Sequence, residues 1–179
     1  DALVNNAAQV VVGPVEATPL EEFRKLMEVN LVGVVRVTQR FLPLVRRARG
    51  RIVNVSSTSG IVALPFTGAY SASKFALEGL SDSLRLELAE SGVCVSGLIA
   101  GAVRTPIWKK SAESLERCVE HAAPDVARAY ARCFGAVCDA MGGESGDTIG
   151  PEVVVRAIDR AIQDRRPRAR YIVGPSAKK

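Results

Sequence analysis

Histidine is almost absent from this chain, and cysteine is scarce. His121 is the single histidine among 179 residues, so we expect neither a Ser-His-Asp triad nor a histidine-based zinc site. The cysteines form no CxxC motif and no Cys/His pair at metal-ligand spacing. These are Cys94, Cys118, Cys133 and Cys138. The sequence therefore predicts no metal site, and its cysteine usage fits free thiols in a reducing cytosol.

Long apolar runs are also lacking. No stretch reaches the roughly 20 apolar residues that a membrane-spanning helix needs. The opening residues 1–6 have neither the basic nor the apolar region of a secretory signal. We therefore expect a cytoplasmic protein without a membrane span.

Aromatic residues make up only 5% of a chain whose net charge is +5. Nucleic-acid-binding surfaces combine basic side chains with exposed aromatic ones. The assignment of an RNA-binding domain would therefore depend on net charge alone. Much of the positive charge lies in two clusters at expected helix ends, where cations complement the helix dipole. The clusters are Arg46, Arg47, Arg49 and Arg51, and Arg165, Arg166, Arg168 and Arg170. We expect solvated helix ends there and no nucleic-acid partner.

Short β-branched runs alternate with longer amphipathic segments. Expected strands lie at 3–4, 51–55, 93–99 and 171–173, and expected helices at 20–45, 69–90, 107–141 and 151–164. Thr18 is the expected N-cap of the first helix. This alternation predicts an α/β fold with a parallel sheet covered on both faces.

The helix expected at 69–90 carries small and apolar residues at helical spacing. They are Ala72, Phe75, Ala76, Gly79, Leu80, Ser83 and Leu84. We expect this stripe to pack against the sheet or a second subunit, and the helix suggests a homodimer or homotetramer.

Tyr70, Lys74 and Ser57 form the most specific chemical pattern in the chain. A tyrosine titrates near pH ~10, and a lysine four residues later on a helix can stabilise the phenolate and lower that pKa. Ser57 follows an expected strand, and its hydroxyl can hold a substrate oxygen while the proton moves. A Tyr/Lys pair at this spacing can also be a solvated surface pair, but the flanking motifs favour catalysis.

Loops after three expected strands contain the remaining candidates. Ligands of open parallel sheets bind beyond the carboxyl ends of the strands. Residues 5–7, Ser57 and residues 101–105 all follow strands, so we expect a cofactor to lie along that edge.

Together these motifs resemble those of the short-chain dehydrogenase/reductase family. They are Asn5-Asn6-Ala7-Ala8, Asn30, Ser57, Tyr70-x3-Lys74 and Ala100-Gly101-Ala102-Val103-Arg104-Thr105. The resemblance covers nearly all of residues 1–179 and implies a Rossmann-like doubly wound sheet. The sequence around Tyr70 is similar to the group near retinol and 17β-hydroxysteroid dehydrogenases.

The resemblance implies NAD- or NADP-dependent hydride transfer between an alcohol and a carbonyl. Tyr70 would be the general acid/base, Lys74 would lower its pKa and hold the nicotinamide ribose, and Ser57 would orient the substrate. Asn30 would position a water near Lys74; the alternative role for it is that of a buried amide that satisfies a neighbouring backbone group. The cofactor would also contact Asn6, Ala7, Ala8, Gly101, Val103 and Thr105.

Two departures and one absence qualify the resemblance. Ala8 and Ala100 replace an expected glycine and proline, which should weaken cofactor binding. No Gly-rich phosphate turn precedes these motifs, so we expect residues 1–179 to be the C-terminal part of a short-chain dehydrogenase/reductase domain, without its N-terminal βαβ units and its extreme C-terminus. We expect this part to be inactive in isolation. A non-catalytic binding or scaffold protein on the same fold is the alternative.

Overall fold

A four-stranded parallel sheet in the order β1-β2-β3-β4 forms the centre of the fold. The computed structural model describes residues 1–142 and 148–175. For residues 135, 136 and 138–142 it describes the backbone only, so the side chain of Cys138 lies outside the described residues. The strands are β1 (Ala2–Asn5), β2 (Arg51–Ser57), β3 (Cys94–Ala100) and β4 (Arg170–Val173). The expected parallel sheet is confirmed, and β2 extends two residues further than expected, as far as Ser57.

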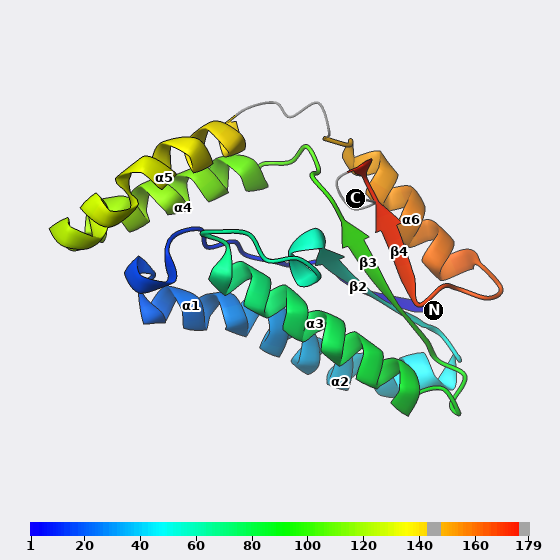
Figure 1. The fold of residues 1–179 in the computed structure, drawn as a ribbon. Coiled ribbons are helices and arrows are strands. Elements are labelled where there is room, and N and C mark those ends of the chain that lie inside the picture. Colours follow the sequence, from blue (N-terminus) through cyan, green and yellow to red (C-terminus); the bar gives the residue numbers. More distant parts are fainter. Residues whose placement is uncertain (143–147, 176–179) are drawn as a thin grey trace.

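Helices cover both faces of this sheet (Figure 1). On one face lie α1 (Leu20–Met27), the π-helical turn η2 (Glu28–Val32), α2 (Gly33–Arg47) and α3 (Gly68–Glu87). On the other face lies α6 (Pro151–Gln163). The pair α4 (Ile107–His121) and α5 (Pro124–Gly142) extends past the carboxyl ends of the strands. The single expected helix over 107–141 is therefore two helices, because Pro124 lacks the N–H that would continue α4 and instead begins α5.

Successive side chains of β2 point to opposite faces of the sheet and pack into two separate apolar layers. Ile52 is fully buried on the side of α2 and α3, and Val53 is fully buried on the side of α6. The first layer is completed by Val45, Leu88, Val93 and Val95. The second is completed by Leu98, Ala157, Ala161 and Tyr171. Burial on both faces explains why β2 has apolar residues at the successive positions 52 and 53.

The expected N-cap at Thr18 is wrong. The Thr18 hydroxyl donates to the carbonyl of Pro14 at 2.8 Å instead of accepting from the start of α1. Pro19 occupies the cap position and has no side-chain cap hydrogen bond. The 3-10 turn η1 (Val15–Ala17) before α1 supplies the nearer carbonyl that the hydroxyl binds.

The small-residue stripe of α3 does not face the sheet. Ala72, Gly79 and Ser83 are exposed, and Phe75 is 45% exposed. The buried face is mostly polar and consists of Ser71, Ser73, Lys74, Glu78 and Ser81 with Ala69 and Leu77.

Buried amides of the sheet explain this polar helix face. Asn54 of β2 donates to the Ser81 hydroxyl at 2.8 Å and accepts from Asn5 of β1 at 2.8 Å. Asn5 also donates to Thr38 of α2 at 3.2 Å. Buried polar groups require partners, so apolar spacing alone could not identify the inner face of α3.

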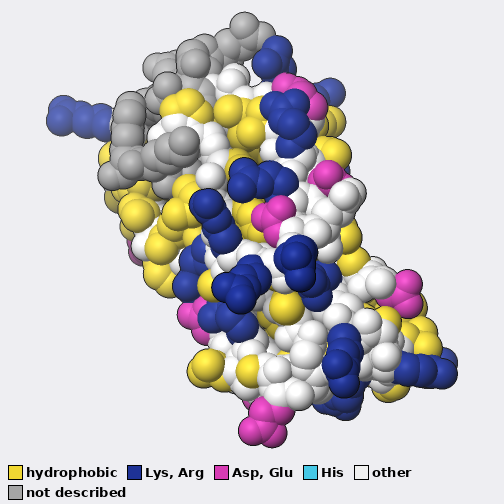
Figure 2. Space-filling model, turned by 90° about the vertical axis from the view of Figure 1, so that its right-hand side faces the viewer, with side chains coloured by type: hydrophobic (Ala, Val, Ile, Leu, Met, Phe, Trp, Pro, Cys, Tyr) yellow, Lys and Arg dark blue, Asp and Glu magenta, His cyan; other side chains and the backbone are white. Residues whose placement is uncertain are grey.

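The arginine clusters lie at the amino ends of the strands. Arg46 and Arg47 fall in the last turn of α2, as expected for helix-end cations. Figure 2 shows many Lys and Arg side chains, with a few acidic ones between them, over one side of the molecule. Arg170 departs from the expectation, since it begins β4 and pairs with carboxylates of α3.

Candidate active site

The carboxyl ends of the four parallel strands meet at one edge, where the predicted catalytic residues gather. Ser57 is the last residue of β2, and Tyr70 and Lys74 lie in the first turns of α3. The 3-10 turn η3 (Thr58–Gly60) follows β2 and packs against α3. A Cβ added at Gly60 would lie 3.0 Å from the carbonyl oxygen of Lys74, so glycine permits this close approach.

The Ser57 side chain, at the end of β2, lies near enough to the Tyr70 phenol to change its pKa. A hydrogen bond from Ser57 lowers the pKa of the Tyr70 phenol, but burial has the larger, opposite effect, and the pKa is raised overall. The phenol is therefore held in its protonated form by its surroundings, and the serine favours the phenolate.

Lys74 lies one helical turn after Tyr70 and is 3% exposed. Its Nζ donates to the Val55 carbonyl at 3.0 Å and lies 5.8 Å from the centre of the Tyr70 ring. Burial lowers the pKa of Lys74 to about 8, and the negative charge of Glu78 acts in the opposite direction. Lys74 is thus a buried cation held beside the phenol by a strand carbonyl.

The lowering of the Tyr70 pKa by Lys74 stays a prediction. The two effects on the Tyr70 pKa are burial and the Ser57 hydrogen bond, and the net direction is upward. Burial is the larger of the two, and the Lys74 Nζ binds the Val55 carbonyl and lies over the phenol ring. A further positive charge at the site would be needed to make the phenol a base near neutral pH.

Asn30 joins the segment after β1 to the start of α3. Its amide oxygen accepts from the Gln9 N–H at 2.7 Å, and its Nδ2 donates to the Gln9 carbonyl at 2.9 Å and the Ser73 hydroxyl at 3.0 Å. Ser73 in turn donates to the Tyr70 carbonyl at 2.7 Å. The side chain of Asn30 therefore satisfies backbone groups, the second of the two roles predicted for it.

The backbone around Asn30 is unusual as well. Residues Glu28–Val32 form a π-helical turn between α1 and α2. Such widened turns often occur at functional sites. The water-positioning role predicted for Asn30 stays a prediction.

The predicted cofactor-binding residues lie along the same edge. Asn6, Ala7 and Ala8 are exposed directly after β1 and are followed by Gln9, which Asn30 binds. Gly101 follows β3, and its N–H donates to the Val173 carbonyl at 2.8 Å.

Val103 and Thr105 also have structural partners. Val103 pairs with Ile149 in a parallel bridge, and its carbonyl accepts from the Trp108 indole N–H at 2.8 Å. The exposed Thr105 accepts from the Ile107 N–H at 3.4 Å, at the start of α4. The loop 101–105 is thus fixed by α4 and by residue 149.

Three groups that shape the site were not predicted from the sequence. They are the Ser73 hydroxyl, the Val55 carbonyl and the Glu78 carboxylate. Ser73 lies inside the Tyr70-x3-Lys74 motif, so a polar residue at a buried helical position could have drawn attention to it. The role of a strand carbonyl has no signal in the sequence, because every residue has one.

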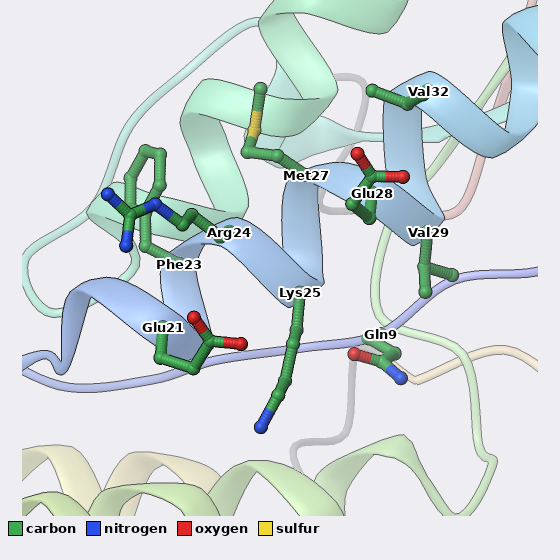
Figure 3. Close-up of a pocket in the computed structure, with 9 residues that line it drawn as sticks. All are labelled: Gln9, Glu21, Phe23, Arg24, Lys25, Met27, Glu28, Val29 and Val32. Carbon is green, nitrogen blue, oxygen red and sulfur yellow. The ribbon is translucent and has the colours of Figure 1, made fainter.

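A hollow of about 590 Å³ lies beside Gln9, along the outer side of α1 (Figure 3). Glu21 and Lys25 extend toward the segment that carries Gln9. The walls combine apolar side chains, such as Met27, with charged ones. This hollow is lined by Gln9, α1 and η2, and neither Ser57, Tyr70 nor Lys74 borders it.

Two further observations concern the described residues alone. No group of three or more His, Cys, Asp or Glu side chains gathers there as a metal site would require. None of the helices there combines the length and the apolar character that crossing a membrane demands.

Comparison with known proteins agrees with this geometry. The short chain dehydrogenase family profile matches residues 1–116. Dehydrogenase/reductase SDR family member 9 of Bos taurus is 36% identical over 98% of this chain and 56% of its own length. Retinol dehydrogenase 16 of Homo sapiens is 39% identical over 98% of this chain and 57% of its own length. A short-chain dehydrogenase structure from Streptomyces avermitilis is 32% identical with a TM-score of 0.78, over 99% of this chain and 62% of that one.

The chain belongs to the short-chain dehydrogenase/reductase family, and its fold is the Rossmann-like sheet that the resemblance implied. Retinol dehydrogenases are among its relatives, as the sequence around Tyr70 predicted. The chain spans between 56% and 62% of the length of the first relatives it matches.

Proposed function

We propose that this chain provides the catalytic residues of an NAD(P)-dependent oxidoreductase acting on an alcohol or a carbonyl. The observation that carries the proposal is the gathering of Ser57, at the end of β2, with Tyr70 and the buried Lys74 at the start of α3, where Nζ lies 5.8 Å from the ring centre. Serine, phenol and ammonium at one sheet edge can hold a substrate oxygen and exchange its proton.

In the oxidation direction, Tyr70 as phenolate takes the hydroxyl proton of the alcohol, which becomes a carbonyl as hydride leaves its carbon. Ser57 donates a hydrogen bond to the same oxygen and keeps it in line with the phenol. Lys74 stabilises the phenolate electrostatically. The nicotinamide cofactor, when bound, supplies the hydride acceptor in oxidation and the donor in reduction.

The residues present suit a nicotinamide cofactor. Main-chain groups of loop 101–105 and the exposed turn of Asn6, Ala7 and Ala8 border the edge where Tyr70 lies. We assign cofactor contacts to both segments and to the side chains of Tyr70 and Lys74. In loop 101–105 the contacting residues are Gly101, Val103 and Thr105. The substrate class that the relatives' names favour is a retinoid or another small hydrophobic alcohol.

A spectrophotometric assay tests this proposal. NAD(P)H absorbance is followed with steroid, retinoid and aliphatic carbonyls, using the longest natural chain that contains residues 1–179. We expect oxidation of NADH or NADPH that depends on the added carbonyl. Absence of turnover across the panels, with no cofactor binding by fluorescence, would favour the scaffold alternative.

We further propose that two copies associate through the outward stripe of α3. Phe75 is 45% exposed, and a Cβ added at Gly79 would meet nothing within 4 Å. Phe41 and Leu44 of α2 are 46% and 52% exposed. Small residues on such a face allow helices to approach closely.

Analytical ultracentrifugation tests this association. We expect Phe75→Glu to convert dimers or tetramers to monomers, because a carboxylate would be buried without a partner. Val155→Glu is the matched control, since Val155 is 62% exposed on α6 at the opposite sheet face. A monomeric unaltered chain at all concentrations, or equal disruption by the control, would contradict the assignment.

A further inference from the structure

A cluster of ion pairs lies one helical turn beyond Lys74. Glu78 of α3 is 8% exposed, and its Oε2 accepts from Arg170 Nε at 2.9 Å. Arg170 also donates to Asp82 at 2.7 Å, and Arg85 donates to Asp82. The first residue of β4 is thus tied to two successive turns of α3.

Glu78 is only partly satisfied by these contacts. Its Oε1 is buried and has no hydrogen-bond partner among the described residues. The carboxylate lies over Gly97 of β3, where an added Cβ would be 3.5 Å from Oε1. Burying a carboxylate oxygen without a hydrogen-bond partner lowers the stability of the fold. Structural stability alone is a weak reason for it, since apolar residues often replace buried ion pairs without loss.

The charge of Glu78 acts on Lys74. The two residues lie four positions apart on the buried face of α3, the spacing at which helical side chains are neighbours. Burial drives the pKa of Lys74 down to about 8, and the Glu78 charge raises it against that effect. Without the carboxylate, a larger fraction of Lys74 would be neutral at pH 7.

Few charges surround this carboxylate. In the described ranges, the charged groups of the cluster are Lys74, Asp82 and Arg85 on α3 and Arg170 on β4. The strand β3 presents Gly97, which is uncharged. Asp82 and Glu78 both accept hydrogen bonds from Arg170, and Glu78 is the carboxylate that acts on Lys74.

We propose that Glu78 is a positioning residue that keeps the buried Lys74 side chain as an ammonium ion. The catalytic consequence rests on the proposed oxidoreductase function, because an ammonium ion is what stabilises the Tyr70 phenolate. The electrostatic link itself is independent of any reaction.

NMR titration of lysines labelled with ¹³C at Cε tests that link, with the Lys74 signal assigned by its loss in Lys74→Met. We expect Glu78→Gln to lower the titration midpoint of Lys74 relative to the unaltered chain. Asp82→Asn is the matched control, since it removes the other carboxylate partner of Arg170 and should leave the midpoint unchanged. An unchanged or raised midpoint in Glu78→Gln, or an equal fall in the control, would overturn the proposal.

A second variant covers the possibility that Glu78→Gln does not fold because Arg170 loses its partner. The double change Glu78→Gln with Arg170→Gln removes both charges, and we expect the same fall in the Lys74 midpoint. In an active protein, the alkaline limb of the pH–activity profile should also move to lower pH. If the NMR midpoint falls but the carbonyl assay shows no turnover, the inference stands and the proposed function fails.

Discussion

Replacing Tyr70 with phenylalanine is expected to reduce turnover by about 10²–10⁴-fold, the usual contribution of a general acid/base. The change deletes the hydroxyl that Ser57 contacts and keeps the ring that lies 5.8 Å from Lys74 Nζ. Since one hydrogen bond contributes about 1 kcal/mol net, the fold should persist. Turnover is measured by NAD(P)H absorbance, and folding by circular dichroism.

The control for this change is Tyr171→Phe in β4. Tyr171 is a buried tyrosine whose hydroxyl binds Asp164 and the Arg168 N–H, against α6 rather than the candidate site. It should retain near-normal turnover at a small cost in stability. Comparable activity of Tyr70→Phe and the unaltered protein would remove the role assigned to the phenol.

Replacing Lys74 with methionine is expected to abolish turnover and yet stabilise the fold at pH 7. The folded-state pKa of about 8 lies below the ordinary 10.5, so folding disfavours the charged form. At 1.36 kcal/mol per pKa unit, the charged lysine costs about 3 kcal/mol below pH 8. Loss of the hydrogen bond to Val55 offsets about 1 kcal/mol of the gain.

The stability gained by Lys74→Met depends on pH. Between pH 8 and 10.5 the unfolded chain binds a proton at Lys74 that the folded chain has lost, so stability rises with pH. The gain in unfolding free energy from Lys74→Met should therefore decrease between pH 8 and 10.5. Urea unfolding at pH 7 and at high pH measures it. Lys109→Met, at a side chain 83% exposed, is the control and should change stability little. A Lys74→Met chain less stable than the original at pH 7 would contradict the argument.

The position of the candidate catalytic group in the fold could be predicted from the sequence because its spacing is local. Tyr70 and Lys74 lie one turn apart on any helix, and Ser57 ends a strand whose β-branched residues identify it. The parallel sheet was equally predictable, since alternating strands and helices allow few other arrangements. Regular hydrogen bonding and short-range spacing determine these features.

The inner face of α3 and the partners of the site residues depended on tertiary structure. Ala72 and Phe75 follow the apolar spacing of a buried stripe, yet Ser73, Lys74 and Glu78 are the buried residues. The difference arises because α3 packs against buried amides of β1 and β2, and polar groups far apart in the chain satisfy one another there.

By itself, the sequence determined the family, the parallel sheet and the choice of a candidate phenol, amine and hydroxyl, since each depends on neighbours along the chain. Only the tertiary structure decided the protonation preferences of that group. Burial raises the pKa of Tyr70 and lowers that of Lys74, and Glu78 opposes the second shift. The physical reason is that the energy of a charge depends on everything packed around it.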